Sequence, residues 1–353
     1  MIVEGPPTRH VGSLVGDLLG HVADGRPLAP NRPVEEWTWA LRGGLGPLLH
    51  RAAGHTSAPP AGTWSARLHG EDLTARLRHA EVVETASRVL STCARLEIGA
   101  TLLKGISIAA EAYPEAHLRP MADVDMLVTA EAAPALEAAL LEEGFEFTGD
   151  RADPGSQHRP PLVCPPTRTI VELHTDLFDD RSDLRKGRMF DVRALAERTI
   201  ASSFQDRPAR RLRPEWQLAY AASSWVNDLT HHGIHPSFLV SLFDGMHLLR
   251  AHGNRLDWDS LLGGLDNEFA AASLDLFLAL LQRHGLSTVP AQVSARLAAR
   301  QRLVGPLQRR LTVRTLDRCI VRGLGWQLPV PLPVPGRYSL RRQVRKRILA
   351  VVC

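Results

Sequence analysis

The segment RPMADVDMLV, residues 119–128, places two aspartates two positions apart in an otherwise hydrophobic run. Alternate residues of a β-strand point to the same face, so Asp123 and Asp125 would stand together while the hydrophobic residues between and after them point into the core. Two like charges about 7 Å apart along a strand repel each other, and burying either without a partner costs several kcal/mol. A bound divalent cation would offset this cost, although exposed strands also carry alternating acids.

A second hydrophobic segment, TIVELHTDL, repeats this pattern with a glutamate. Its valine and leucine face one side, so Glu172 and His174 face the other. If the two strands are neighbours, Glu172 can meet Asp123 and Asp125 to form a site of three carboxylates. Hard oxygen ligands of this kind suit Mg²⁺ or Mn²⁺, and such a site serves in-line phosphoryl or nucleotidyl transfer.

Several residues near these acids could contact the phosphates of a nucleotide. Where the strand LLKG opens into a helix, backbone N–H groups at Gly105 could hold phosphate oxygens, and Lys104 could add a point charge. Arg119 could bind phosphate through its guanidinium fork, with an ordinary surface arginine as the alternative. His158 and His174 could contact the nucleotide or an acceptor, with a hydrogen-bonded structural histidine as the alternative for each.

Strand and helix signals alternate around the acids, as expected for a sheet that positions them. Before them, IGATLLKG predicts a strand that ends at Gly105 and leads into a helix reaching about Tyr113. After them, a helix with Gly144 at its C-terminal cap precedes three strand-like segments, FEFTG, PLVCP and TIVELH. Because each helix must cover a face of the sheet, we expect a mixed sheet of about four to five strands.

Helical periodicity dominates on both sides of this segment. Residues 65–96 form one long helical pattern, and the pattern is helical again over 214–299. The buried face of the first is predicted to carry Leu73, Leu77, Val82, Val83, Ala86 and Leu90. We therefore expect an α+β fold, a small mixed β-sheet core flanked by N-terminal helices and a C-terminal helical domain. The expected domains are an N-terminal helical region at 1–96, the α/β core at 97–205, the C-terminal helical domain at 206–325, and a Pro-rich linker with a basic tail at 326–353.

Composition narrows the class of protein. The hydrophobic fraction of 44% and the charged fraction of 23% are typical of a folded globular chain. No hydrophobic run reaches the ~20 residues of a membrane span, and the N-terminus lacks a signal peptide pattern, so we expect no transmembrane segment and a cytoplasmic location. The four cysteines are scattered, which argues against a disulfide framework or structural zinc. Motifs of serine hydrolases, P-loop ATPases, dehydrogenases and protein kinases are absent.

The positive charge is concentrated at the C-terminal end. From Gln301 onward the chain has 12 basic residues and one acidic residue, Asp317. This basic tail could bind an anionic membrane or an acidic partner, with a solvated helix as the alternative, and its near-absence of aromatic side chains argues against nucleic acid as the partner.

The order of a strand, a glycine turn, a helix, DxD on a strand and a single acid on a later strand resembles the DNA polymerase β-like nucleotidyltransferase superfamily. More narrowly, LLKGISIAAEAYPEAHLRPMADVDMLV, GFEF, QHRPPLVCP and TIVELHTDL resemble an uncharacterised bacterial nucleotidyltransferase family whose members often lie in peptide natural-product clusters. The resemblance is strongest over 101–177 and continues more faintly to about residue 290. The sequence departs from the superfamily at Lys104-Gly105, where Gly-Ser or Gly-Gly is usual.

The resemblance implies that Asp123 and Asp125 bind two metal ions and that Glu172 holds the catalytic one near the acceptor hydroxyl. It further implies an Mg²⁺- or Mn²⁺-dependent enzyme that moves a nucleoside monophosphate from an NTP, with ATP as the expected donor. The acceptor would bear a hydroxyl and could be a peptide or a small natural product. Two alternatives stay open, namely phosphoryl transfer from the same site and a non-catalytic scaffold that binds a peptide or protein.

Overall fold

The computed structural model describes residues 18–21, 40–54, 64–149, 155–231, 238–287 and 289–322. The chain divides into two compact units. The sheet unit comprises Gly70–Leu218 and Arg250–Asp266, and the helical unit comprises Met1–His69, Ala219–Leu249 and Asn267–Cys353. The expected Pro-rich linker and basic tail at 326–353 lie outside the described residues.

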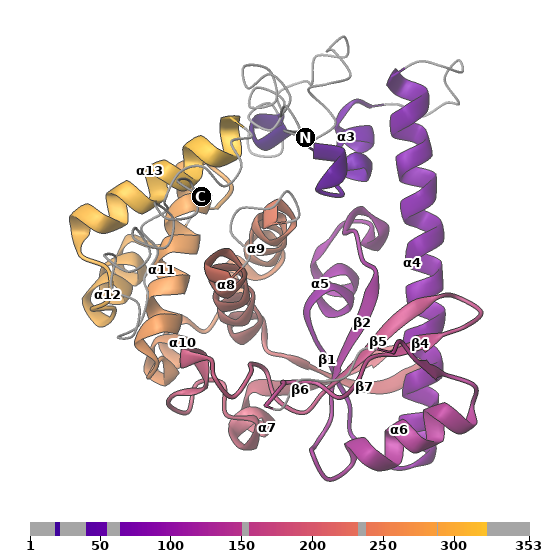
Figure 1. Ribbon diagram of the computed structural model, residues 1–353. Helices are drawn as coiled ribbons and strands as arrows, with labels where there is room; N and C mark the ends of the chain where they lie inside the picture. Colours follow the sequence, from indigo (N-terminus) through magenta and orange to yellow (C-terminus); the bar gives the residue numbers. More distant parts are fainter. Residues whose placement is uncertain are drawn as a thin grey trace, which may run out of the picture. The chain divides into compact units, whose positions relative to one another are not determined.

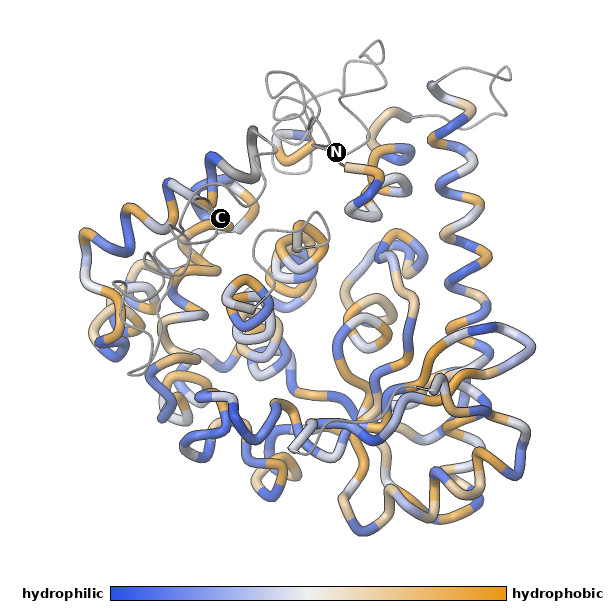
Figure 2. Tube along the Cα trace, viewed as in Figure 1, coloured by the Kyte–Doolittle hydropathy of each residue, from blue (hydrophilic) through white to orange (hydrophobic). Residues whose placement is uncertain are grey.

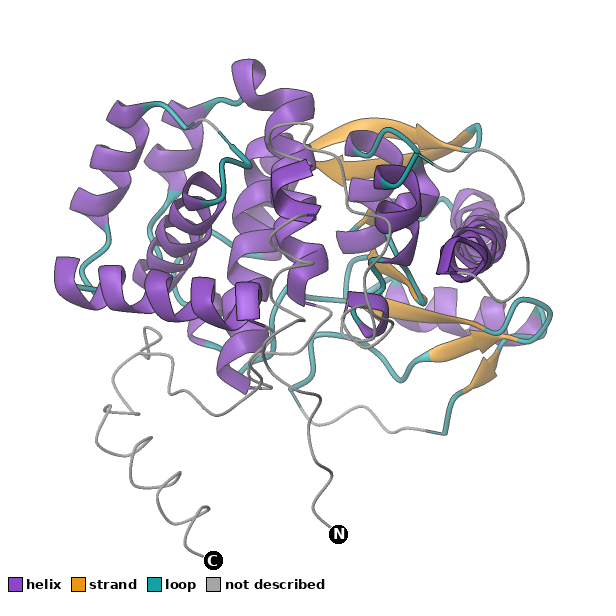
Figure 3. Cartoon of the chain, turned by 90° about the horizontal axis from the view of Figure 1, so that it is seen from above, coloured by secondary structure: helices purple, strands orange, loops and turns teal. Residues whose placement is uncertain are grey.

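One mixed sheet of seven strands forms the centre of the sheet unit (Figure 3). In sheet order the strands are β3 (Glu146–Phe147), β4 (Leu162–Cys164), β5 (Thr169–His174), β2 (Asp123–Leu127), β1 (Thr101–Leu102), β7 (Arg207–Leu212) and β6 (Thr199–Phe204). β2 pairs with β5, and β1 with β7, in parallel, whereas the other neighbours are antiparallel. The expected α+β fold with a mixed sheet is confirmed.

The expectation of four to five strands is wrong, because the β6–β7 hairpin extends the sheet. Its two-residue turn, Gln205 and Asp206, has positive φ angles of 49° and 60°. Turns of this kind usually carry Asn-Gly or Asp-Gly, which this segment lacks. Pro208 also lies within β7, where proline normally argues against a strand. The predicted α/β core ends at residue 205, within this turn. Strand β7 therefore belongs to the sheet although it lies after the predicted boundary.

Two helices cover one face of the sheet, α4 (Trp64–Arg95) and α6 (Ala133–Glu142). In Figure 1, α6 lies below the strands, and α4 runs upright on the right, where β4 and β5 overlap it in this view. Hydrophobic and hydrophilic residues alternate along α4 (Figure 2), and its buried positions meet those of α6 and the strands in one core cluster. That cluster includes Val82, Ala86, Leu90, Leu136, Leu140, Val124, Met126, Val171 and Leu173.

The predicted buried face of the long helix is only partly correct. Val82, Ala86 and Leu90 are at most 1% exposed, but Leu73 and Leu77 are 52% and 62% exposed. Only residues of α4 from Val82 onward belong to the core cluster. The earlier turns of the helix follow the same hydrophobic period but do not pack against the sheet.

Shorter elements complete the sheet unit. Helix α5 (Lys104–Ala112) follows β1, and its first turn contains Lys104 and Gly105, the residues that the sequence predicted to contact phosphate. Gly144, at φ +88°, ends α6 as predicted. The remaining elements are η1 (Ala116–Leu118), η2 (Asp183–Arg185), η3 (Val192–Ala194), α7 (Leu195–Arg198), η4 (Gly253–Arg255) and α10 (Trp258–Gly264).

The helical unit contains only helices among its described residues (Figure 3). They include α3 (Gly46–Ala52), most of α8 (Pro214–His231) and of α9 (Phe238–His252), α11 (Glu268–Arg283), α12 (Ala291–Arg300) and α13 (Pro306–Arg322). The core helix is α11, whose buried Asp275 is held by two hydrogen bonds of 2.7 and 3.0 Å from Arg309 on α13. Across the described part of the chain, no helix has the length and apolar character of a membrane span.

Candidate active site

The acids singled out in the sequence meet on one face of the sheet. β2 and β5 are parallel neighbours, and Asp125 lies opposite Glu172 in their register. The strand residues between the acids, such as Val124 and Val171, are fully buried in the core beneath α4 and α6. Alternation therefore directs Asp123, Asp125 and Glu172 to the other face. The expectation that the two strands are neighbours is confirmed.

Asp125 is the most enclosed of the three carboxylates, at 3% exposed. Its Oδ1 accepts hydrogen bonds from Lys104 Nζ at 2.7 Å and from His174 Nε2 at 2.8 Å. Burial alone would raise the pKa of Asp125, but the charge of Lys104 and the hydrogen bond from His174 outweigh it and hold the pKa well below its usual range. Asp125 is therefore ionised at neutral pH.

The other two carboxylates respond differently to the same surroundings. Burial, together with the negative charge of Asp125, raises the pKa of Asp123 to about 6. The hydrogen bond with His174 lowers the pKa of Glu172 below its usual value. Burial, together with repulsion from the neighbouring acids, therefore makes Asp123 resist ionisation, and a bound cation would relieve both effects.

The turn between β1 and α5 brings basic groups to the same acids. Lys104 starts α5 with φ +42°, a left-handed conformation that costs a non-glycine residue free energy. Next to it, a Cβ on Gly105 would lie 2.3 Å from Arg119 Nη1, so the guanidinium of Arg119 packs directly on the backbone of the turn. The positive charge of Arg119 acts on Asp123. Lys104, Gly105 and Arg119 therefore lie together beside the carboxylates.

His174 lies closer to the carboxylates than the sequence suggested. It is fully buried, and its Nε2 lies 2.8 Å from Asp125 Oδ1 and 3.4 Å from Glu172 Oε2. Burial would lower the pKa of His174, but the hydrogen bonds to Asp125 and Glu172 raise it above its usual value. His174 follows Glu172 by two residues along β5, and this spacing predicted that its ring lies on the same face as the carboxylates.

His158 lies next to His174. Its backbone bridges that of His174, and the two rings lie edge to face with centroids 5.6 Å apart. Its Nδ1 donates a 2.8 Å hydrogen bond to the backbone carbonyl of Arg159. Arg159 in turn donates two hydrogen bonds, of 2.9 and 2.6 Å, to the carboxylate of Glu137 on α6. His158 therefore supports the loop against β5.

The donor set suits a metal ion. One ligand atom each from Asp125, Glu172 and His174 lies within 4.8 Å of the others, so these three residues could hold one cation. Carboxylate oxygens are the ligands that Mg²⁺ and Mn²⁺ prefer, and imidazole nitrogen is accepted by first-row transition ions. Asp123 adds negative charge to the same place. The residues present therefore fit a divalent cation.

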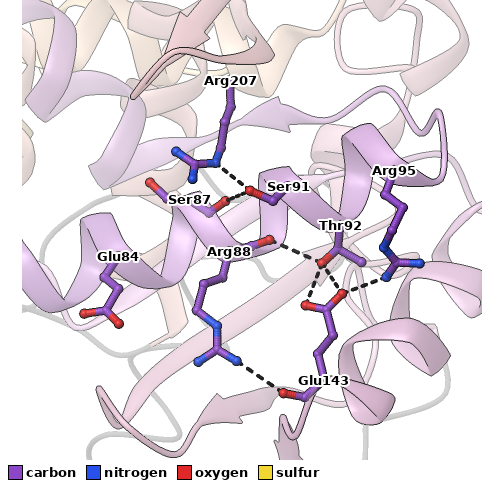
Figure 4. Close-up of a pocket in the computed structure, with 8 residues that line it drawn as sticks. All are labelled: Glu84, Ser87, Arg88, Ser91, Thr92, Arg95, Glu143 and Arg207. Carbon is purple, nitrogen blue, oxygen red and sulfur yellow. Dashed lines mark hydrogen bonds and ion pairs between the residues drawn. The ribbon is translucent and has the colours of Figure 1, made fainter.

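A surface pocket of about 370 Å³ lies elsewhere, along α4 (Figure 4). Several of its polar groups bond to one another, since Arg95 pairs with Glu143 at 2.7 Å and Arg207 donates to Ser91 Oγ at 2.6 Å. The full lining is Glu84, Ser87, Arg88, Ser91, Thr92, Arg95, Glu143 and Arg207. These contacts tie α4 to the end of α6 and to the β6–β7 hairpin, on the face opposite the carboxylates.

Comparison with known proteins gives three findings. A family model described as "uncharacterised nucleotidyltransferase" matches residues 33–284 of this chain. A solved structure, an antigenic nucleotidyltransferase-like protein from Paracoccidioides brasiliensis, is similar at 17% identity and a TM-score of 0.38, over 63% of this chain and 94% of that chain. Among curated proteins there is no significant match.

Proposed function

The chain belongs to the uncharacterised nucleotidyltransferase family, and on that premise we propose that Asp123, Asp125 and Glu172 are its catalytic, metal-binding carboxylates. The reaction is transfer of a nucleoside monophosphate from an NTP, with ATP as the expected donor, to a hydroxyl of an acceptor. The observation that carries this proposal is the parallel pairing of β2 with β5, because it gathers three acids on one face beside Lys104.

The acids would hold Mg²⁺ or Mn²⁺ through their oxygen atoms. Such a cation supplies positive charge that neutralises the phosphates and favours departure of pyrophosphate. Asp125 is ionised, and two hydrogen-bond donors hold its carboxylate in place. It therefore offers the cation a negatively charged oxygen that is already positioned. Asp123 is the acid with the raised pKa, and its ionisation completes the negative charge of the site.

Basic groups at the start of α5 would hold the triphosphate. The first N–H groups of a helix point at an anion placed at its N-terminus, and α5 begins at Lys104. Arg119 offers a guanidinium over Gly105, and the missing Cβ of that glycine leaves room for it. Where the wider superfamily usually has Gly-Ser or Gly-Gly, this chain has Lys104-Gly105. The ammonium group of Lys104 bonds to the carboxylate of Asp125.

The chemical step exchanges one phosphorus–oxygen bond for another. The acceptor oxygen bonds to the α-phosphorus as the bond from that phosphorus to the α,β-bridging oxygen breaks, and pyrophosphate leaves. Glu172 accepts the hydroxyl proton, since 24% of its side chain is exposed, against 5% for Asp125, and its lowered pKa keeps it ionised for this role. The acceptor proposed is a peptide or a small natural product, and the basic tail is proposed to contact an acidic partner.

Product analysis tests the reaction. The full chain is mixed with Mg²⁺, each NTP and hydroxyl-bearing peptides or small molecules, and pyrophosphate is measured together with the mass of the acceptor. We expect pyrophosphate and an acceptor heavier by one nucleoside monophosphate. Release of ADP with a phosphorylated acceptor would assign phosphoryl transfer instead, and peptide binding without turnover would assign a scaffold.

Nucleotide binding tests the site assignment separately. Binding of Mg²⁺·ATP is measured by calorimetry for the wild type, Asp125→Ala and a control, Glu146→Gln, which changes an exposed acid on β3 of the same sheet. We expect the first variant to lose binding and the control to keep it. Equal binding by Asp125→Ala and the wild type would overturn the assignment.

A further inference from the structure

His174 presents one ring nitrogen to two carboxylates at once. Its Nε2 lies 2.8 Å from Asp125 Oδ1 and 3.4 Å from Glu172 Oε2, and the side chain has no exposed surface. Ligands at adjacent corners of an octahedral ion with bonds of about 2.1 Å lie about 3 Å apart. The spacings of this nitrogen and these two oxygens therefore match neighbouring positions around a single ion.

The other ring nitrogen allows this role. His174 Nδ1 is buried and has no hydrogen-bond partner among the described residues. An ionised carboxylate only accepts hydrogen bonds, so Nε2 carries the proton while it bonds to Asp125. No described partner holds the ring in that tautomer from the Nδ1 side, so the proton can move to Nδ1 when Nε2 binds a cation, where a water would have to accept it because metal-bound histidines usually donate this N–H.

We propose that His174 is a nitrogen ligand of the cation site, together with Asp125 and Glu172, and that it makes the site select a first-row transition ion such as Mn²⁺ over Mg²⁺. This inference rests on the proposed function only in that it uses the same cation site. Imidazole binds transition ions well, whereas Mg²⁺ prefers hard oxygen ligands and keeps its water. A set of carboxylates alone would discriminate less between the two ions.

Binding of the metal alone tests the selectivity. Mn²⁺ and Mg²⁺ are titrated separately into the full chain, without nucleotide, for the wild type and for His174→Gln. We expect the wild type to bind Mn²⁺ at least tenfold more tightly than Mg²⁺, and the variant to lose at least tenfold in Mn²⁺ affinity with less than threefold change for Mg²⁺. Failure of the wild type to bind Mn²⁺, or equal losses for both ions, would overturn the proposal.

Electron spin-echo spectroscopy of bound Mn²⁺ tests the ligand directly. We expect ¹⁴N modulation from one imidazole in the wild type, its conversion to a ¹⁵N pattern when the histidines are ¹⁵N-labelled, and its loss in His174→Gln. His158→Gln is the matched control, because its ring is the neighbour of His174 and it should keep the modulation.

The wild-type spectrum keeps the test valid even if His174→Gln does not fold. A Mn²⁺ site without ¹⁴N modulation would overturn the proposal, as would modulation lost in His158→Gln and kept in His174→Gln. These outcomes differ from failure of the proposed function, which would appear as absence of nucleotidyl transfer from a protein whose metal ligands are as described.

Discussion

Asp125 on β2 lies directly opposite Glu172 on β5, and the imidazole of His174 contacts both carboxylates through one nitrogen atom. Parallel neighbours in register place side chains of the same face side by side, so two acids distant in the sequence become one site. Lys104 adds a positive charge to the same oxygen of Asp125.

Replacing Asp125 by asparagine removes the ionised centre of the cluster. We expect Mn²⁺ and Mg²⁺ affinities to fall at least 100-fold and turnover to fall on the order of 10³-fold, because a metal ligand and a fixed charge are lost together. The amide oxygen still accepts hydrogen bonds from Lys104 and His174, so cooperative thermal unfolding should remain. Calorimetry, turnover and circular dichroism are measured beside Glu146→Gln, and a variant that keeps wild-type metal affinity would contradict this role.

The stability of the metal-free protein should depend on Asp123 between about pH 4 and pH 6. The pKa of Asp123 is raised to about 6 by burial and by Asp125, against about 3.9 in an unfolded chain. Between these values the folded state holds a proton that the unfolded state has lost, so the free energy of unfolding should fall by about 1 kcal/mol per pH unit as pH rises. Above about pH 6 this contribution stays lost.

Urea unfolding across that pH range, with a chelator present, measures the effect. Asp123→Asn cannot ionise, so the slope assigned to this carboxyl should disappear in the variant, which should become more stable than the wild type near pH 7. The same pH slope in both proteins would show that Asp123 titrates normally.

A methyl group on Gly105 should disturb nucleotide binding rather than folding. The added Cβ would lie 2.3 Å from Nη1 and 2.8 Å from Cζ of Arg119, and the end of that side chain can move away. We expect Gly105→Ala to weaken NTP binding about tenfold and to change the free energy of unfolding by less than about 1 kcal/mol. Gly99→Ala is the control, because its Cβ would meet nothing within 4 Å. Unchanged NTP affinity in Gly105→Ala would show that Arg119 does not contact the phosphates of the nucleotide.

A methyl group on Gly245 should destabilise the helical unit. Its Cβ would lie 2.3 Å from Cε1 and 2.6 Å from Cζ of Phe277, a ring with no exposed surface that packs on Trp225. Because this ring has no room to move, overpacking should cost about 1 to 3 kcal/mol. Denaturant unfolding of Gly245→Ala is compared with Gly253→Ala, whose Cβ would meet nothing within 4 Å. Equal stabilities would mean that α9 and α11 separate at little cost.

Much of the sheet unit could be predicted from local sequence. The alternation in DVDML and TIVELH fixes which side chains share a face, because successive side chains of any strand point in opposite directions. The glycine signal at Gly144 marked the end of α6, where φ is +88° and a permissive backbone suits the turn. The strand predicted to end at Gly105 ends at Leu102, and the left-handed residue of that turn is Lys104 rather than the glycine. These features depend on bonds and neighbours within a few residues.

Other features depended on contacts that no local pattern contains. The β6–β7 hairpin forms through Gln205 and Asp206, which lack the usual turn signature, and pairing of β7 with β1 supplies hydrogen bonds that local preference does not. Leu73 and Leu77 follow the helical period of α4 but lie where the sheet does not reach, so periodicity alone gave the wrong burial.

By itself, then, the sequence determined that Asp123 and Asp125 share one face of a strand and that Glu172 and His174 share one face of another. Only the tertiary structure decided that these are the same face of one sheet, that Asp125 meets Glu172 in register, and that Nε2 of His174 points at both. The physical reason is that strand pairing is set by the packing of Val124, Met126, Val171 and Leu173 against α4 and α6, and that packing joins segments about fifty residues apart.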